Sequence, residues 1–173
     1  QRAHIEIRFK YFIEKIAPVS GLSSLLDYDC VFEGDLGAAG QLNFILGIAV
    51  PFTSLCPCSR EISDYGAHNQ RGVMKVRIKY VPGRFIWIED LVELMERQGS
   101  CPVYPLLKRE DEKFVTEMAY DNAKFIEDVL RDLVLALRGL DGATWFEVEC
   151  ESFESIHNHS AYAFHEEGDK TPR

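Results

Sequence analysis

Two thiols and an imidazole lie close together in the sequence, directly after an apolar run. Cys56 and Cys58 flank Pro57, and His68 follows Cys58 by ten residues. Proline lacks an N–H and biases the preceding residue toward extended backbone, so we expect Cys56 to end a strand. Thiolate sulfur and imidazole nitrogen suit Zn²⁺ or Fe²⁺. The alternative is two buried thiols and a surface histidine, because this spacing is not a standard zinc signature.

A second group of potential ligands comes later in the chain. His157 and His159 are separated by one residue, so on an extended segment both rings would lie on the same face. A turn with two solvated histidines is the alternative. Glu112, Glu117 and Glu127 are further candidates, although surface carboxylates are the usual case. A mixed set of Cys, His and Glu at strand ends or loops indicates an open, catalytic metal site more than a closed structural one.

Several basic side chains could bind phosphate groups, although each alone is more often a solvated charge. They are Arg60, Arg71, Lys79, Lys108 and Arg109. The formal net charge of −9 argues against a general nucleic-acid binder, but not against a phosphorylated small substrate.

Cysteine content and hydropathy indicate the cellular compartment of the protein. Five cysteines, an odd number without a visible secretion signal, favour reduced thiols in a cytoplasmic protein. There is no apolar run long enough to span a bilayer, so we expect no membrane partner.

Alternation of apolar and polar residues predicts six strands. They cover 4–15, 28–35, 42–52, 72–81, 145–153 and 160–165. The connecting segments are rich in turn-forming residues. We expect a connection at 16–26, turns at 37–40 and 82–83, a loop with a short helical piece at 101–116, and a frayed polar tail at 166–173.

Helical spacing of apolar residues predicts two main helices. One covers 88–97, with Glu89, Asp90, Glu93 and Glu96 on its polar side, and Gly99 ends it. The other covers 121–138, capped by Asp121 or Asn122 and ended by Gly139. A short helix over 60–65 is capped by Ser59.

The order of these elements is strands, then two helices, then two strands. Strands and helices do not alternate as in βαβ units, so we predict an α+β fold with an antiparallel sheet and the helices on one face. A chain of 173 residues suits one domain, and we assign 1–173 to a single catalytic region.

Three segments closely resemble GTP cyclohydrolase type IB. They are 53–71 with Cys-Pro-Cys, 107–117 with Asp-Glu-Lys, and 153–160 with His-Asn-His. The resemblance covers essentially the whole chain. It implies a tunnelling fold in which several subunits, as in a homotetramer, close a barrel and place active sites at subunit interfaces. It also implies family members with an additional N-terminal portion.

The resemblance implies a divalent metal ion, Mn²⁺, Zn²⁺ or Fe²⁺, and ligands for it. The Cys-Pro-Cys motif implies Cys56 as a ligand, with Cys58 the weaker choice. The Ala-His-Asn motif implies His68 as a ligand or acid/base group. The Asp-Glu-Lys and His-Asn-His motifs imply Glu112 and His157 as further ligands.

Other residues are implied as catalytic or substrate-binding. His159 stands beside His157 as a proton carrier, and Glu127 matches the helix carboxylate that grips a purine ring in tunnelling-fold enzymes. Arg60, Arg71 and Lys108 are candidates to hold the triphosphate. Glu110 departs from the family pattern, where we expect proline, and is a rival ligand to Glu112.

The implied reaction converts GTP and water to 7,8-dihydroneopterin triphosphate and formate, the first step of tetrahydrofolate synthesis. Three alternatives stay open at this point. They are an archaeal-type cyclohydrolase that makes a cyclic phosphate, a thiol-based nitrile reductase of queuosine synthesis, and a non-catalytic assembly or pterin-binding module.

Overall fold

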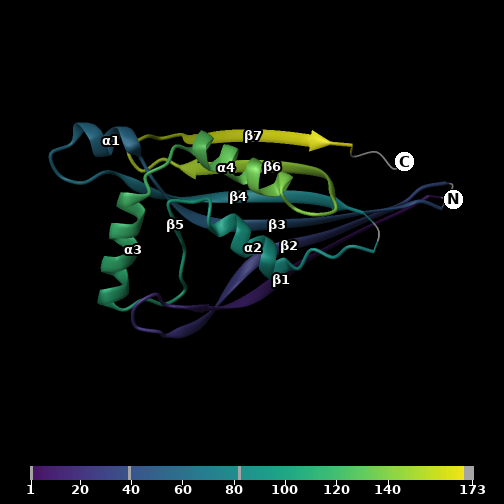
Figure 1. The fold of residues 1–173 in the computed structure, drawn as a ribbon, viewed down its shortest axis with the longest axis horizontal. Helices are drawn as coiled ribbons and strands as arrows, with labels where there is room; N and C mark the ends of the chain where they lie inside the picture. Colours follow the sequence, from purple (N-terminus) through teal and green to yellow (C-terminus); the bar gives the residue numbers. More distant parts are fainter. Residues whose placement is uncertain (1, 39, 82, 170–173) are drawn as a thin grey trace.

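A computed structural model describes residues 2–38, 40–81 and 83–169 (Figure 1). Seven antiparallel strands form one sheet in the order β1-β2-β3-β4-β6-β7, and β5 pairs with β3. The strands are β1 (Ala3–Ile16), β2 (Ser23–Leu36), β3 (Leu42–Leu55), β4 (Asn69–Tyr80), β5 (Cys101–Pro102), β6 (Ala143–Phe153) and β7 (Ser160–Gly168). The α+β class and the antiparallel sheet are therefore confirmed.

The helices are α1 (Pro57–Ile62), α2 (Ile88–Glu96), α3 (Arg109–Asp121) and α4 (Ile126–Arg138). The apolar sides of α2 and α4 pack on the same face of the sheet, which confirms that prediction (Figure 1). Leu91 and Met95 of α2 and Leu133 of α4 are buried in this core. Among the described residues, no helix combines the length and the apolar character that crossing a membrane requires.

Strand β4 shows how its alternating residues separate the two faces of the sheet. Met74, Val76 and Ile78 are buried under the helices, whereas Lys75 and Arg77 point to the opposite face. Side chains with a period of two can satisfy both environments, so this strand lies in the middle of the sheet without mismatch.

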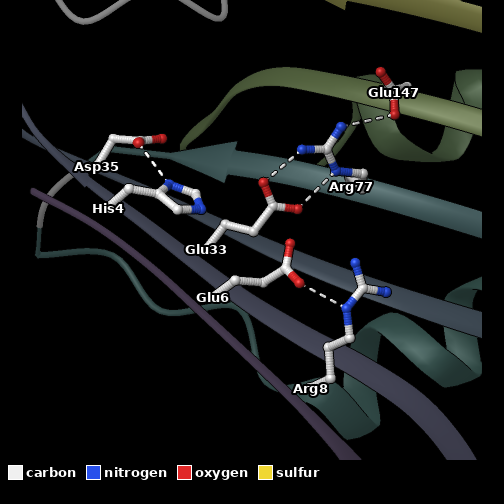
Figure 2. Close-up of polar contacts among 7 residues, drawn as sticks. All are labelled: His4, Glu6, Arg8, Glu33, Asp35, Arg77 and Glu147. Carbon is white, nitrogen blue, oxygen red and sulfur yellow. Dashed lines mark hydrogen bonds and ion pairs between the residues drawn. The ribbon is translucent and has the colours of Figure 1, made fainter.

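Charged side chains on the face without helices pair across neighbouring strands. Figure 2 shows Arg77 between Glu33 of β2 and Glu147 of β6, with N···O distances of 2.6 and 3.0 Å. On β1, Arg8 bonds Glu6, and His4 bonds Asp35 of β2, both at 2.7 Å. The Arg77 and Arg8 pairs line a hollow of about 850 Å³ whose charges are largely satisfied by one another.

The expected connection at 16–26 is wrong in part, because β2 already begins at Ser23 and pairs with Ile16 of β1. The turn between these strands is held by Asp111 of α3. The Asp111 carboxylate accepts bonds from the amides of Val19 and Ser20, both at 2.8 Å, and from the Ser20 hydroxyl at 2.6 Å. The same carboxylate also accepts a hydrogen bond from the Lys108 amide at 2.9 Å. Asp111 therefore caps the N-terminus of α3 and at the same time anchors the β1–β2 hairpin to this helix.

Replacing Asp111 with Asn should lower the melting temperature by roughly 5 °C or more near neutral pH. Burial alone raises the pKa of Asp111, but the bonds from Ser20, Lys108 and Val19 outweigh it and hold that pKa well below its ordinary value. Because the pKa of Asp111 is lower in the folded protein than in the unfolded chain, the ionised carboxylate stabilises the fold at pH values above the pKa of the unfolded chain. This stabilisation is lost as the pH falls toward the pKa of the folded protein. The melting temperatures of the wild type and of Asp111→Asn should therefore converge as the pH is lowered from 7 into the acid range. A difference in melting temperature that stays constant with pH would contradict this account.

The chain from 109 to 125 differs from the expectation. The segment 101–116 was predicted as loop with a short helical piece, yet α3 begins at Arg109, and α4 begins at Ile126 and not at Asp121. The Asn122 side chain donates to the carbonyls of Gly99 and Ser100 at 3.0 and 3.1 Å. These tertiary bonds separate the helices, and the Asp128 carboxylate caps α4 by accepting the Phe125 amide at 3.2 Å.

Glu96 is buried, so its assignment to the polar side of α2 is wrong. Its carboxylate pairs with Lys15 of β1 and accepts the Tyr28 hydroxyl of β2 at 2.7 Å. These two partners make burial of the charge acceptable. The helix itself ends at Glu96, three residues before Gly99, which packs against the Phe52 ring.

Other boundaries change by a few residues. Strand β7 continues to Gly168, so the frayed tail expected from 166 is wrong for 166–168, and residues 170–173 lie outside the described residues. The turns predicted at 37–40 and 82–83 include residues 39 and 82, which also lie outside them.

Candidate functional site

The end of β3, helix α1 and the start of β4 bring Cys56 and His68 together. Leu55 pairs with Asn69 in the register of the two strands. The next pair outward is joined by a bond from the Cys56 amide to the His68 carbonyl at 3.2 Å. The segment from 57 to 67 therefore leaves the sheet and returns beside Cys56. The predicted end of the strand at Cys56 is one residue too late, because β3 ends at Leu55 and Cys56 is the N-cap of α1.

Helix α1 begins earlier than expected, because Cys56 and not Ser59 is its N-cap. Cys56 is extended, with φ −74° and ψ 117°, and Pro57 occupies the first turn, where its missing N–H costs nothing. The Ser59 hydroxyl donates to the Cys56 carbonyl at 3.1 Å and accepts the His68 amide at 3.2 Å. The Ser59 hydroxyl thus bridges the backbones of Cys56 and His68.

The thiols differ in accessibility. Cys58 is exposed and Cys56 is half-buried, whereas Cys30, Cys101 and Cys150 are buried. Burial raises the pKa of Cys30 to about 11 and that of Cys150 to about 12, so these thiols stay protonated at neutral pH. The two accessible thiols are the ones that the sequence pattern singled out.

A pocket of about 460 Å³ lies between this corner and the C-terminal half of α3. Its walls come from the ends of β3 and β4 and from one side of α3. They are formed by Leu55, Gly66, Ala67, Asn69, Thr116, Glu117, Tyr120 and Asp121. Glu117 lines it, whereas Glu112 does not and lies one turn before Thr116 on α3. The hollow on the other face is larger, but its charges are already paired, so we place the candidate site here.

Gln70 is a site residue that the sequence reasoning missed. It is almost fully buried, and its amide oxygen lies 2.9 Å from Nδ1 of His68. The same oxygen accepts the Ser155 hydroxyl at 3.3 Å. Ser155 belongs to the β6–β7 connection, which also carries His157 and His159 and lies at the α1 end of the molecule (Figure 1). Those two exposed rings stack on each other with centroids 5.0 Å apart.

The predicted substrate-binding residues are placed differently from one another. The Arg60 guanidinium lies 4.4 Å from the Tyr120 ring centroid, beside the pocket. Glu127 is exposed in the first turn of α4, just after Lys124, whose amide bonds the Leu55 carbonyl at 3.2 Å. Both are therefore at the Cys56 end of the sheet.

Arg71 and Lys108 are not brought to this pocket. Arg71 pairs with Thr53 and follows Gln70 on the opposite face of β4, away from the helices. Lys108 is the N-cap of α3, which at 1.5 Å per residue is roughly 20 Å from the Asp121 end. Within residues 2–38, 40–81 and 83–169, no group of three or more His, Cys, Asp or Glu side chains is arranged to hold a metal ion. The ligand set Cys56, His68, Glu112 and His157 stays a prediction.

Comparison with known proteins decides the family. The model of the family described as type I GTP cyclohydrolase folE2 matches residues 1–163. The chain belongs to this family. It is 61% identical over 161 residues to the GTP cyclohydrolase FolE2 of Geotalea uraniireducens, covering 93% of this chain and 58% of that protein.

Two further members of the FolE2 family show the same pattern. The GTP cyclohydrolase FolE2 of Geobacter sulfurreducens is 61% identical over 93% of this chain, and 61% of that protein is covered. The one from Magnetococcus marinus is 56% identical over 99% of this chain, and 63% of it is covered. The chain thus spans about three fifths of the length of the curated relatives it matches.

Proposed function

We propose that the protein containing this chain is a GTP cyclohydrolase that converts GTP and water to 7,8-dihydroneopterin triphosphate and formate. One observation carries the proposal. In a chain of the FolE2 family, Cys56 and His68 are joined by a backbone bond of 3.2 Å at the edge of a pocket. Reaction at guanine C8 needs an activated water and a proton carrier in one place, and this corner offers groups for both.

The donors at this corner fit a divalent metal ion, Mn²⁺, Zn²⁺ or Fe²⁺. An accessible thiol and an imidazole held on adjoining backbone segments provide a soft sulfur and a nitrogen ligand. We propose Cys56 and His68 as two ligands, completed by Glu112 and His157. When bound, the ion lowers the pKa of a water molecule toward neutrality.

The protein side chains would bind the substrate and move protons. The imidazole of His159 can accept a proton from the attacking water and return it to the ring nitrogen as the bond to C8 breaks. The Glu127 carboxylate can accept two hydrogen bonds from the N–H edge of guanine. Arg60, Arg71 and Lys108 would neutralise the triphosphate.

A site shared between copies would explain the scatter of these residues over one chain. Lys108 and Glu112 belong to the first turns of α3, away from the pocket, and could serve the site of a neighbouring copy. We therefore propose a homo-oligomer, a tetramer, in which sheets from several units close a barrel and active sites lie at interfaces. We place this enzyme in the cytoplasm, without nucleic acid as a partner.

Formate release and pteridine fluorescence from GTP test the proposal. The full-length protein is freed of metal with a chelator and then loaded separately with Mn²⁺, Fe²⁺ or Zn²⁺. We expect metal-dependent formation of both products, with the triphosphate identified by mass. A cyclic phosphate product would move the protein to the archaeal type, and no turnover with any metal would overturn the proposal.

A further inference from the structure

We infer that Gln70 is a positioning residue that, together with Glu154, sets which nitrogen of His68 carries the proton. His68 directly precedes β4 and Gln70 is the second residue of that strand, so the two side chains are two residues apart and lie on the same side of the chain. The Gln70 amide oxygen is 2.9 Å from Nδ1 of His68. The inference concerns the ring itself, and only its consequence for metal binding rests on the proposed function.

The orientation of the Gln70 amide follows from its other contacts. Its nitrogen donates to the Ser152 hydroxyl at 3.2 Å and to the Glu154 carboxylate at 3.3 Å. A carboxylate only accepts hydrogen bonds, so the NH₂ group must face Glu154. The reverse orientation would set the amide oxygen against the carboxylate oxygen. The amide oxygen must therefore face His68 and the Ser155 hydroxyl.

An amide oxygen also only accepts hydrogen bonds, so Nδ1 of His68 must be the donor. In a neutral imidazole the other nitrogen, Nε2, then keeps its lone pair. This is the nitrogen left to bind a metal ion or accept a proton. The chain of contacts from Glu154 through Gln70 to His68 thus sets the tautomer that the proposed chemistry needs.

The surroundings keep this chain of contacts rigid. Gln70 and Ser152 are 9% and 1% exposed, so the amide is largely shielded from water. The His68 backbone is held on both sides, with its carbonyl accepting the Cys56 amide and its own amide donating to Ser59. Ring and backbone are therefore held by different elements. The ring contacts Gln70 of β4, which is itself held by β6 and the loop after it, and the backbone is held by α1 and its N-cap.

The tautomer can be measured by solid-state ¹⁵N NMR of the full-length protein labelled on histidine and free of metal. Spectra are recorded at alkaline pH, where the imidazole is neutral, and the His68 signals are those lost in His68→Asn. We expect a protonated Nδ1 and an unprotonated Nε2. In Gln70→Leu the proton should shift to Nε2, the form that free histidine favours in water. A wild-type His68 protonated on Nε2, or a Gln70→Leu spectrum like the wild type, would overturn the inference.

Two further variants separate positioning from folding. Glu154→Gln keeps the size of a half-buried side chain but allows the Gln70 amide to turn over, so it should give a mixture of tautomers. Gln98→Leu removes a comparable amide, whose nitrogen donates to the Leu94 carbonyl at 2.7 Å on α2, and should leave His68 unchanged. An unmixed, wild-type spectrum in Glu154→Gln would count against the role of Glu154.

The consequence for metal binding is measured apart from turnover. Titration with Mn²⁺ should show affinity lowered by about 10- to 100-fold in Gln70→Leu and unchanged in Gln98→Leu. Equal affinity in Gln70→Leu and the wild type would overturn this consequence. Absence of GTP turnover with the expected tautomers intact would overturn the proposed function and leave the inference standing.

Discussion

Replacing Cys56 with alanine is expected to lower the rate of formate release from GTP by at least about 10³-fold, because it would remove a proposed ligand of the metal ion that activates water. The variant should also copurify with less metal, as measured by elemental analysis. Its fold should persist, since the Cys56 amide still bonds the His68 carbonyl and this bond involves only backbone.

The matched control is Cys58→Ala, which removes the exposed thiol two residues away. It should keep both metal content and a rate close to the wild type. A reversed result would make Cys58 the ligand. Cys56→Ser distinguishes a ligand from a covalent nucleophile, because full metal occupancy without product would show that the thiol attacks the substrate and would refute our assignment.

Replacing Gly72 with alanine is expected to destabilise the fold by about 3 kcal/mol, because the added methyl group has no room. A Cβ at Gly72 would lie 2.6 Å from the Glu151 carbonyl oxygen of β6 and 2.6 Å from the Phe52 ring of β3. The carbonyl belongs to a paired strand and cannot turn aside, and Phe52 is fully buried. The melting temperature should fall by roughly 6–12 °C.

Gly139→Ala is the control for this substitution. Gly139 has an ordinary φ of −80° at the end of α4, and a Cβ there would meet nothing closer than the Ala136 carbonyl oxygen at 3.3 Å. Its melting temperature should stay near that of the wild type. Equal effects at the two positions would show that the crowding around Gly72 relaxes easily.

The strands and the two core helices could be predicted because their patterns are local. Period-two alternation in β4 and helical spacing in α4 each reflect one buried and one exposed side. The failures occur where a distant group decides. Glu96 reads as a polar helix position until Lys15 and Tyr28 meet it, and the break before α4 depends on bonds from Asn122 to Gly99 and Ser100.

The candidate site divides in the same way. Cys56 and His68 can be recognised in the sequence as potential ligands near the end of a strand. They lie together because the chain from 57 to 67 leaves the sheet and returns to pair β4 with β3. Gln70 was missed, although its His-x-Gln spacing on a strand was a usable signal. Its partner Glu154 is 84 residues further along the chain, and no local pattern connects the two.

Residue types and their periodicity were thus enough to predict the α+β class and the helix-covered face, and to mark Cys56, Cys58 and His68 as candidates, because each depends on near neighbours in the chain. The accessibility of the two thiols was decided by the structure. The pocket beside α3, the anchoring of the β1–β2 turn by Asp111 and the contacts that orient His68 required the folded structure. Each of these depends on hydrogen bonds or packing between segments far apart in sequence, whose partners are chosen by the geometry of the sheet.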